Sequence, residues 1–186
     1  PTAFVASFGS GAPVIAFLGE YDALSGLSQQ EGLPEKKPLI EGGNGHGCGH
    51  HLLGVGSLAA AAAVKEILTK NKLPGTVRYY GCPGEEGGSG KAFMARAGAF
   101  KDVDAALTWH PLTHNAIWST RFLANYQVAF RFHGKSSHAA SAPHVGRSAL
   151  DAVELMNIGV NYLREHVVPD ARMHYAITNS GGASPN

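Results

Sequence analysis

Apolar side chains along this chain gather in short runs that alternate with one long alanine-rich stretch and several glycine-rich segments. Residues 14–18 form a continuous apolar run, which is typical of a strand buried on both faces. Residues 76–80, rich in β-branched and aromatic side chains, predict a second strand, and residues 103–109 a third. Helices are expected over 50–70 and 91–97. Strands that alternate with helices indicate an α/β fold with a mostly parallel sheet and flanking helices.

The pattern changes after about residue 120. Residues 124–132 alternate between polar and apolar side chains, which predicts a strand with one face in water. An amphipathic helix over 148–166 and a strand over 173–178 should follow it. This β-loop-α-β run favours the first half of a smaller α+β domain. We therefore expect two domains, 1–118 and 119–186.

Composition and charge exclude some classes of partner. The net charge is +1 and no cluster of Lys or Arg is present, so nucleic acid is not an expected partner. Spanning a bilayer takes an apolar run of ~20 residues, and none is expected here, so we expect no membrane partner either. With two cysteines and no visible signal peptide, a reduced, cytoplasmic protein is the expectation. Glycine is abundant, 24 of 186 residues, and suggests backbone held close to a site.

Side chains that bind metals or transfer protons stand where three predicted strands and a helix meet. Cys48 and His50 lie in a glycine-rich segment just before the long helix. Glu85 and Glu86 follow the second strand, and His110 follows the third. Ligands collect outside the carboxyl ends of the strands in an open α/β sheet. These side chains are therefore expected to converge on a metal site of a hydrolase.

Each of these residues also has a simpler interpretation. Cys48 and His50 at i, i+2 are good zinc ligands, but they also fit a buried thiol and a helix-capping imidazole. The pair at 85–86 fits either one ligand and one free base or a solvated acidic turn. His110 fits a ligand or a core histidine. Asp22, beyond the first strand, is expected to orient a ligand histidine or to cap a turn.

Several motifs occur in a fixed order along the chain. They are Gly19-Glu-Tyr-Asp-Ala-Leu24, Gly45-His-Gly-Cys-Gly-His50, Glu85-Glu-Gly-Gly-Ser-Gly-Lys91, Trp109-His-Pro111, Gly134-Lys-Ser-Ser-His138, Pro143-His-Val-Gly-Arg-Ser-Ala-Leu-Asp151 and Pro185-Asn186. In this order they resemble the M20 metallopeptidase family, in its amidohydrolase branch, and within that branch the aminobenzoyl-glutamate hydrolase group. The resemblance runs from about residue 14 to the end of the chain.

The resemblance implies a zinc-peptidase-like catalytic domain interrupted by a ferredoxin-like lid domain that also dimerises. It implies two divalent metal ions per site, Mn or Zn, and hydrolysis of an amide bond in an N-acyl or N-aroyl amino acid or dipeptide resembling aminobenzoyl-glutamate. The partners it implies are that small-molecule substrate and a second copy of the chain, joined through the lid.

The resemblance also assigns roles to residues. Glu85 would act as general base, His138 of the lid would donate to the oxyanion across the dimer, and Asn186 would lie near the substrate. The implied metal ligands are Cys48, His50, Glu86 and His110.

Three departures from the family pattern leave alternatives open. His51 stands where relatives usually have Asn or Asp, and Gly84 where many have Ala. Family members also continue past Asn186, and the last histidine ligand lies in that continuation. A truncated, non-catalytic fragment or dimerisation module is therefore one alternative. A thiol hydrolase with Cys48 as nucleophile is a lower-ranked one, because it leaves Glu85, Glu86 and His110 unexplained.

Overall fold

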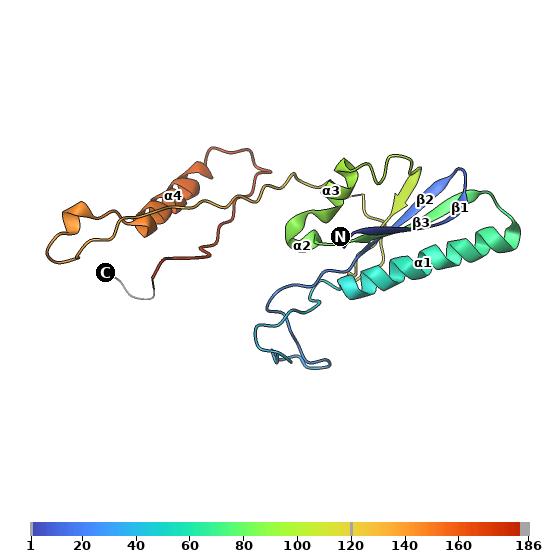
Figure 1. Cartoon of the computed structure of the whole chain (residues 1–186), viewed down its shortest axis with the longest axis horizontal. Helices are drawn as coiled ribbons and strands as arrows, with labels where there is room; N and C mark the ends of the chain where they lie inside the picture. The colour runs from blue at the N-terminus through green and yellow to red at the C-terminus, as the bar shows by residue number, and fades with distance from the viewer. Residues whose placement is uncertain (1, 120, 183–186) are drawn as a thin grey trace. The chain divides into compact units, whose positions relative to one another are not determined.

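The computed structural model describes residues 2–119 and 121–182 and divides the chain into two compact units, Pro1–Ala116 and Ile117–Asn186. The break lies close to the boundary expected from the sequence. The catalytic and lid roles of the two units stay predictions. Figure 1 shows the elements of both units. In chain order, they are β1 (Phe4–Ser10), β2 (Val14–Glu20), α1 (His50–Asn71), β3 (Gly75–Cys82), α2 (Glu85–Gly88), α3 (Gly90–Arg96), β4 (Ala105–Leu107), η1 (Pro143–Val145) and α4 (Ala149–Leu163).

The first unit is built on a four-stranded sheet in the order β1-β3-β2-β4. β2 pairs in parallel with both β3 and β4, whereas β1 pairs antiparallel with β3 at one edge. The expected α/β fold with a mostly parallel sheet and flanking helices is thus confirmed. β1 was not predicted from the sequence. The predicted third strand, 103–109, is shorter than expected, because only three of its residues pair with β2.

Helices cover both faces of this sheet, and the alternation of side chains along β2 and β3 accounts for it (Figure 1). One face contributes Ala16, Tyr80 and Cys82, which pack with Met94 of α3. The opposite face contributes residues such as Val77, which pack against α1. Strands buried on both faces are expected to read as near-continuous apolar runs, as β2 does. Packing on both faces of the sheet fixes the parallel strands, so their carboxyl ends lie together at one edge of the sheet.

The length and composition of α1 would also allow it to span a membrane. From the sequence we expected no apolar segment long enough to span a membrane, and α1 does not meet that expectation. In this structure α1 packs against the sheet, and its buried positions include Leu53, Ser57 and Ala61. Ser57 Oγ donates to the carbonyl oxygen of Leu18 at 2.8 Å, which ties the helix to β2.

The second unit differs from the sequence-based expectation in its strands. The helix α4 forms within the predicted range 148–166, and Ser148 caps it by accepting from the backbone N–H of Asp151 at 3.1 Å. The segments 124–132 and 173–178, predicted as strands, form no ladder within the described part of the chain. A strand needs a hydrogen-bonded neighbour, and the alternating pattern at 124–132 indicates only that one face suits burial. The expected ferredoxin-like arrangement of this unit stays a prediction.

Candidate metal centre

The carboxyl ends of β2 and β3 and the N-terminus of α1 bring five polar side chains together. β2 ends at Glu20, two residues before Asp22, and α1 begins at His50. β3 is followed, after two residues, by the short helix α2, whose first two residues are Glu85 and Glu86. The sequence suggested a constrained loop at this point, and the structure shows one turn of helix capped by a glycine in the left-handed conformation.

Gly49 shapes the approach to this centre. Its φ is 79°, in the left-handed region that favours glycine, and it directly precedes the first residue of α1. A Cβ atom at this position would lie 2.9 Å from Cγ of Pro111, closer than real Cβ atoms approach a neighbour. The turn therefore lets the segment of Cys48 pack against the segment that comes after β4 and carries His110.

His50 is the central side chain of the group, and only 1% of it is exposed. Its Nδ1 lies 3.1 Å from Oδ1 of Asp22 and 3.2 Å from the Asp22 carbonyl oxygen. Its Nε2 faces three carboxylates: Glu20 Oε2 at 3.1 Å, and Glu85 Oε2 and Glu86 Oε1 at 3.8 Å each. If Nδ1 donates to Asp22, the neutral imidazole keeps its lone pair on Nε2, which is the tautomer that a metal ligand at this nitrogen requires.

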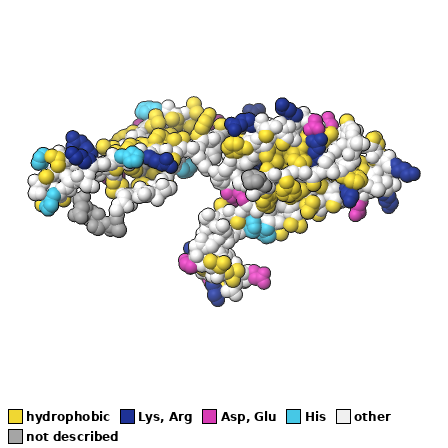
Figure 2. Space-filling view, in the orientation of Figure 1, with side chains coloured by type: hydrophobic (Ala, Val, Ile, Leu, Met, Phe, Trp, Pro, Cys, Tyr) yellow, Lys and Arg dark blue, Asp and Glu magenta, His cyan; other side chains and the backbone are white. Residues whose placement is uncertain are grey.

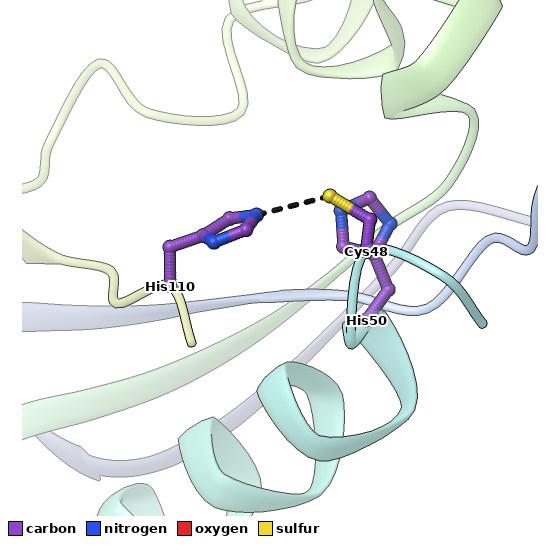
Figure 3. A group of neighbouring side chains, drawn as sticks. All are labelled: Cys48, His50 and His110. Carbon is purple, nitrogen blue, oxygen red and sulfur yellow. Dashed lines mark hydrogen bonds between the residues drawn. The ribbon is translucent and has the colours of Figure 1, made fainter. Parts of the chain in front are cut away.

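Cys48 and His110 complete the group from the other side. Figure 3 shows the Cys48 thiol and the His110 ring pointing toward one another, with the His50 ring beside the thiol. Cys48 Sγ lies 3.2 Å from Nε2 of His110, and the two imidazole rings are 6.0 Å apart at 84°. The donor atoms of Cys48, His50 and His110 all lie within 4.8 Å of one another, a spacing that could hold a metal ion. A second such group consists of Glu20, His50 and Glu85.

Two buried atoms in this centre have no hydrogen-bond partner among the described residues: His50 Nε2 and Glu86 Oε1. An unsatisfied buried polar atom costs about 1–3 kcal/mol, so such atoms call for an explanation. A lone pair on imidazole, a thiol and several carboxylate oxygens around one point are the donor set of zinc and related divalent ions. The residues present therefore fit a divalent metal.

Charge around the centre shifts two pKa values. Burial raises the pKa of Asp22, but hydrogen bonds from the backbone of Glu86 and other groups outweigh it, and the pKa is lowered overall. The backbone N–H of Glu86 donates to Asp22 Oδ2 at 3.0 Å. The pKa of the Cys48 thiol is raised by burial first, then by a hydrogen bond with Glu86 and the negative charge of the neighbouring carboxylates. These shifts favour an ionised Asp22 carboxylate and a protonated Cys48 thiol near neutral pH.

The structure brings most of the predicted site residues together. Those it gathers are Asp22, Cys48, His50, Glu85, Glu86 and His110. His138 belongs to the second unit, where its Nδ1 accepts from the backbone N–H groups of Ala140 and Ser141 at 3.2 and 3.1 Å. Asn186 lies outside the described residues, so its expected place near the substrate stays a prediction.

Sequence reasoning overlooked two residues of the centre. Glu20, at the end of β2, faces His50, and its other carboxylate oxygen forms an ion pair with Lys91 of α3. Glu20 lies within the first motif and Lys91 within the third, so both positions were visible. Nothing in the spacing of the two motifs indicated that they meet.

Comparison with known proteins identifies the family of this chain. The sequence profile of peptidase family M20/M25/M40 matches residues 16–177, and the chain belongs to this family. It is 63% identical over 186 residues to a subunit of the p-aminobenzoyl-glutamate hydrolase of Escherichia coli (strain K12), covering all of this chain and 39% of that protein. It is 36% identical over 195 residues to Xaa-Arg dipeptidase of Mus musculus, covering all of this chain and 41% of that protein.

A solved structure shows the same fold. A proposed aminohydrolase from methicillin-resistant Staphylococcus aureus matches with a TM-score of 0.57 at 22% sequence identity, covering 90% of this chain and 46% of that one. The chain therefore spans less than half the length of these relatives. The resemblance to the M20 family is confirmed, and the activity of the whole protein is a matter for proposal.

Proposed function

We propose that this protein is a metal-dependent amidohydrolase that cleaves the amide bond of an N-acyl or N-aroyl amino acid or dipeptide. The observation that carries the proposal is the buried Nε2 of His50, which has no hydrogen-bond partner among the described residues and is surrounded by a thiol, a second imidazole and three carboxylates. The name of the bacterial relative, a p-aminobenzoyl-glutamate hydrolase, supports a substrate of the aminobenzoyl-glutamate kind.

Two divalent ions would be held by the side chains that meet at the strand ends. When bound, such ions act as Lewis acids toward a carbonyl oxygen and lower the pKa of water. The thiol and imidazoles suit zinc, and the carboxylates suit manganese as well. The proposed ligands are Cys48, His50, Glu86 and His110.

The two adjacent glutamates would have different roles, Glu86 as a metal ligand and Glu85 as the general base. The side chain of Glu86 is 25% exposed, and its buried Oε1 has no hydrogen-bond partner in the part of the chain that the structure describes, which suits a ligand. The side chain of Glu85 is 43% exposed, so it can reach water and substrate. Glu85 would take a proton from the attacking water and later give it to the leaving amine, as general base and then general acid.

Two further residues would support the reaction. Asp22 would hold the proton of His50 on Nδ1 and so keep Nε2 available as a donor atom. His138 accepts two backbone hydrogen bonds at Nδ1, which leaves the ring proton on Nε2 in its neutral form. From Nε2 it could donate to the oxyanion that forms during amide cleavage.

The proposal also includes partners and location. We propose a homodimer joined through the second unit, with His138 acting in the partner's site and Asn186 near the substrate. The bacterial relative is itself named as a subunit. A cytoplasmic location and no binding of nucleic acid or membrane complete the proposal. On the face seen in Figure 2, the Lys and Arg side chains of the first unit are dispersed among hydrophobic ones.

A thiol hydrolase is the second candidate, because Cys48 Sγ and His110 Nε2 lie within 3.2 Å. A nucleophilic cysteine needs a lowered pKa and a positive environment. The pKa of Cys48 is instead raised, and three carboxylates contribute to that shift. A thiol hydrolase also leaves Glu85 and Glu86 without a role, whereas a metal centre uses both.

The test combines metal removal with one substitution. Dialysis against a chelator should abolish hydrolysis of an aminobenzoyl-glutamate-like substrate, and Mn²⁺ or Zn²⁺ should restore it. Glu85→Ala should reduce turnover by at least ~100-fold while metal content stays the same, because Glu85 acts on protons rather than as a ligand. Glu66→Ala, a change on the exposed surface of α1, is the matched control. Activity that survives chelation but is lost on alkylation of Cys48 would instead support the thiol hydrolase.

A further inference from the structure

Glu20 is a buried acidic residue that the proposed ligand set does not use. It closes β2, and only 8% of it is exposed. A carboxylate this deeply buried is unfavourable unless it is paired or binds a metal. Two groups meet it: Lys91 at one carboxylate oxygen and His50 at the other.

Lys91 determines which way this carboxylate is turned. It lies in the first turn of α3, and its Nζ forms an ion pair with Glu20 Oε1. The second oxygen, Oε2, is thereby directed at Nε2 of His50. The ion pair also offsets the charge of Glu20, so a further anionic side chain can stay beside Glu85 and Glu86.

The contact between Glu20 and His50 is close, yet it is not a hydrogen bond. Oε2 lies 3.1 Å from Nε2, and Nε2 has no hydrogen-bond partner among the described residues. Two donors bound to one ion at about 2.1 Å lie roughly 3.0–3.4 Å apart, for octahedral to tetrahedral angles. The separation of these two atoms falls in that interval. Cys48 Sγ and His110 Nε2, at 3.2 Å, have a similar spacing.

We propose that Glu20 is an additional donor of the metal centre, binding through Oε2 beside His50 Nε2, and that Lys91 is the residue that positions it. This inference rests on the proposed function. It predicts that one ion is shared by Glu20 and His50 and that the Lys91 ion pair limits Glu20 to a single coordinating oxygen.

The test measures metal binding directly. Metal-free protein would be titrated with Mn²⁺, Zn²⁺ and Co²⁺ in competition with a chromophoric chelator, and the visible spectrum of the Co²⁺ form recorded. Glu20→Gln should weaken binding of at least one ion by ~10-fold or more and alter the Co²⁺ spectrum, because the oxygen that remains is a weaker, uncharged donor. Lys91→Met should also alter the spectrum, because the carboxylate is then free to turn.

Two further variants separate this role from a structural one. Glu20→Gln leaves Lys91 without its partner, so the double variant Glu20→Gln/Lys91→Met removes both charges and avoids an unpaired ion. Asp102→Asn is the matched control, because Asp102 pairs with Arg78 outside the centre. The inference predicts weakened binding in the double variant and unchanged binding in the control.

The outcomes are distinguishable. Should the double variant bind every ion within twofold of wild type with an unchanged Co²⁺ spectrum, Glu20 is not a donor and the inference is wrong. Wild-type protein that takes up no ion at all would overturn the proposed function, and this inference with it. Weakened binding and a changed spectrum in the Glu20 variants, with a normal control, would support both.

Discussion

Asp22 and His50 are joined at two points, with Nδ1 of the imidazole 3.1 Å from the Asp22 carboxylate and 3.2 Å from its carbonyl oxygen. The same carboxylate accepts the backbone N–H of Glu86 at 3.0 Å. One aspartate thus fixes the orientation of a proposed ligand and the start of the helix that carries another. Partners of this kind often matter nearly as much as the ligands themselves.

Asp22→Ala should therefore lower metal affinity by roughly 10–100-fold, because His50 loses the group that fixes its tautomer and ring orientation. Chelator competition on the purified variant measures this. Asp22→Asn, which keeps an acceptor oxygen, should lose less. Equal affinities for wild type and Asp22→Ala would show that His50 is held without this contact.

Gly49→Ala should destabilise the protein by more than the cost of the left-handed conformation alone. That conformation costs a non-glycine residue roughly 1–2 kcal/mol, and here the new Cβ would also meet Pro111 at 2.9 Å. Gly42→Ala is the matched control, because Gly42 has a similar φ of 68° and open space around it. Thermal unfolding of both variants gives the difference. Equal losses would mean that the contact with Pro111 does not matter.

The ion pair between Arg78 and Asp102 should make the stability of the fold decrease at acidic pH. Two hydrogen bonds of 2.6 and 2.7 Å from Arg78 hold the pKa of Asp102 below its ordinary value. A lowered folded-state pKa contributes stability above the unfolded pKa, and this contribution is lost as pH falls through the folded value. Wild type should therefore exceed Asp102→Asn in Tm at neutral pH, and the difference should shrink below about pH 4.

One result would directly contradict this prediction. A Tm difference that stays constant from neutral pH to about pH 3 would show that the Asp102 carboxylate does not act through its charge. An exposed pair of this kind is expected to give only a small difference in Tm.

His138→Ala should reduce kcat by roughly 100–1,000-fold and leave metal content unchanged, because an oxyanion donor acts only in the transition state. Steady-state kinetics and elemental analysis of the same sample separate the two effects. If His138 acts across a homodimer, mixing His138→Ala with Glu85→Ala should recover part of the activity, because one mixed site keeps both residues. No recovery in mixed dimers would place His138 and Glu85 in the same subunit's site.

Periodicity and composition predicted the elements that carry their own sequence signal, such as a helix rich in alanine or a strand buried on both faces. The run at 14–18 and the alanine-rich stretch at 50–70 became β2 and α1, because each carries its own signal in side-chain pattern. β1 was missed, since all seven of its residues are exposed and it is defined mainly by pairing with β3. The segments 124–132 and 173–178 show the converse: a strand-like pattern does not supply a neighbour to pair with.

The site was predictable as far as chain order determines geometry. Parallel strands place the segments that come after them at one edge of the sheet, so Glu86 and His110 could be expected near His50. Individual contacts between side chains could not be predicted in this way. The contact of Glu20 with Lys91 depends on the rotation of α3 against the sheet, which no local pattern encodes.

The central claim is that thiol, imidazole and carboxylate donors from separate segments share divalent ions. Anomalous X-ray diffraction from crystals of the metal-loaded protein, collected on both sides of the Zn or Mn absorption edge, tests it most directly. We predict two peaks, with one or both within about 2.0–2.4 Å of Cys48 Sγ and His50 Nε2. Fully loaded crystals with no peak beside these two atoms, or with the Cys48 thiol turned away from His110, would contradict it.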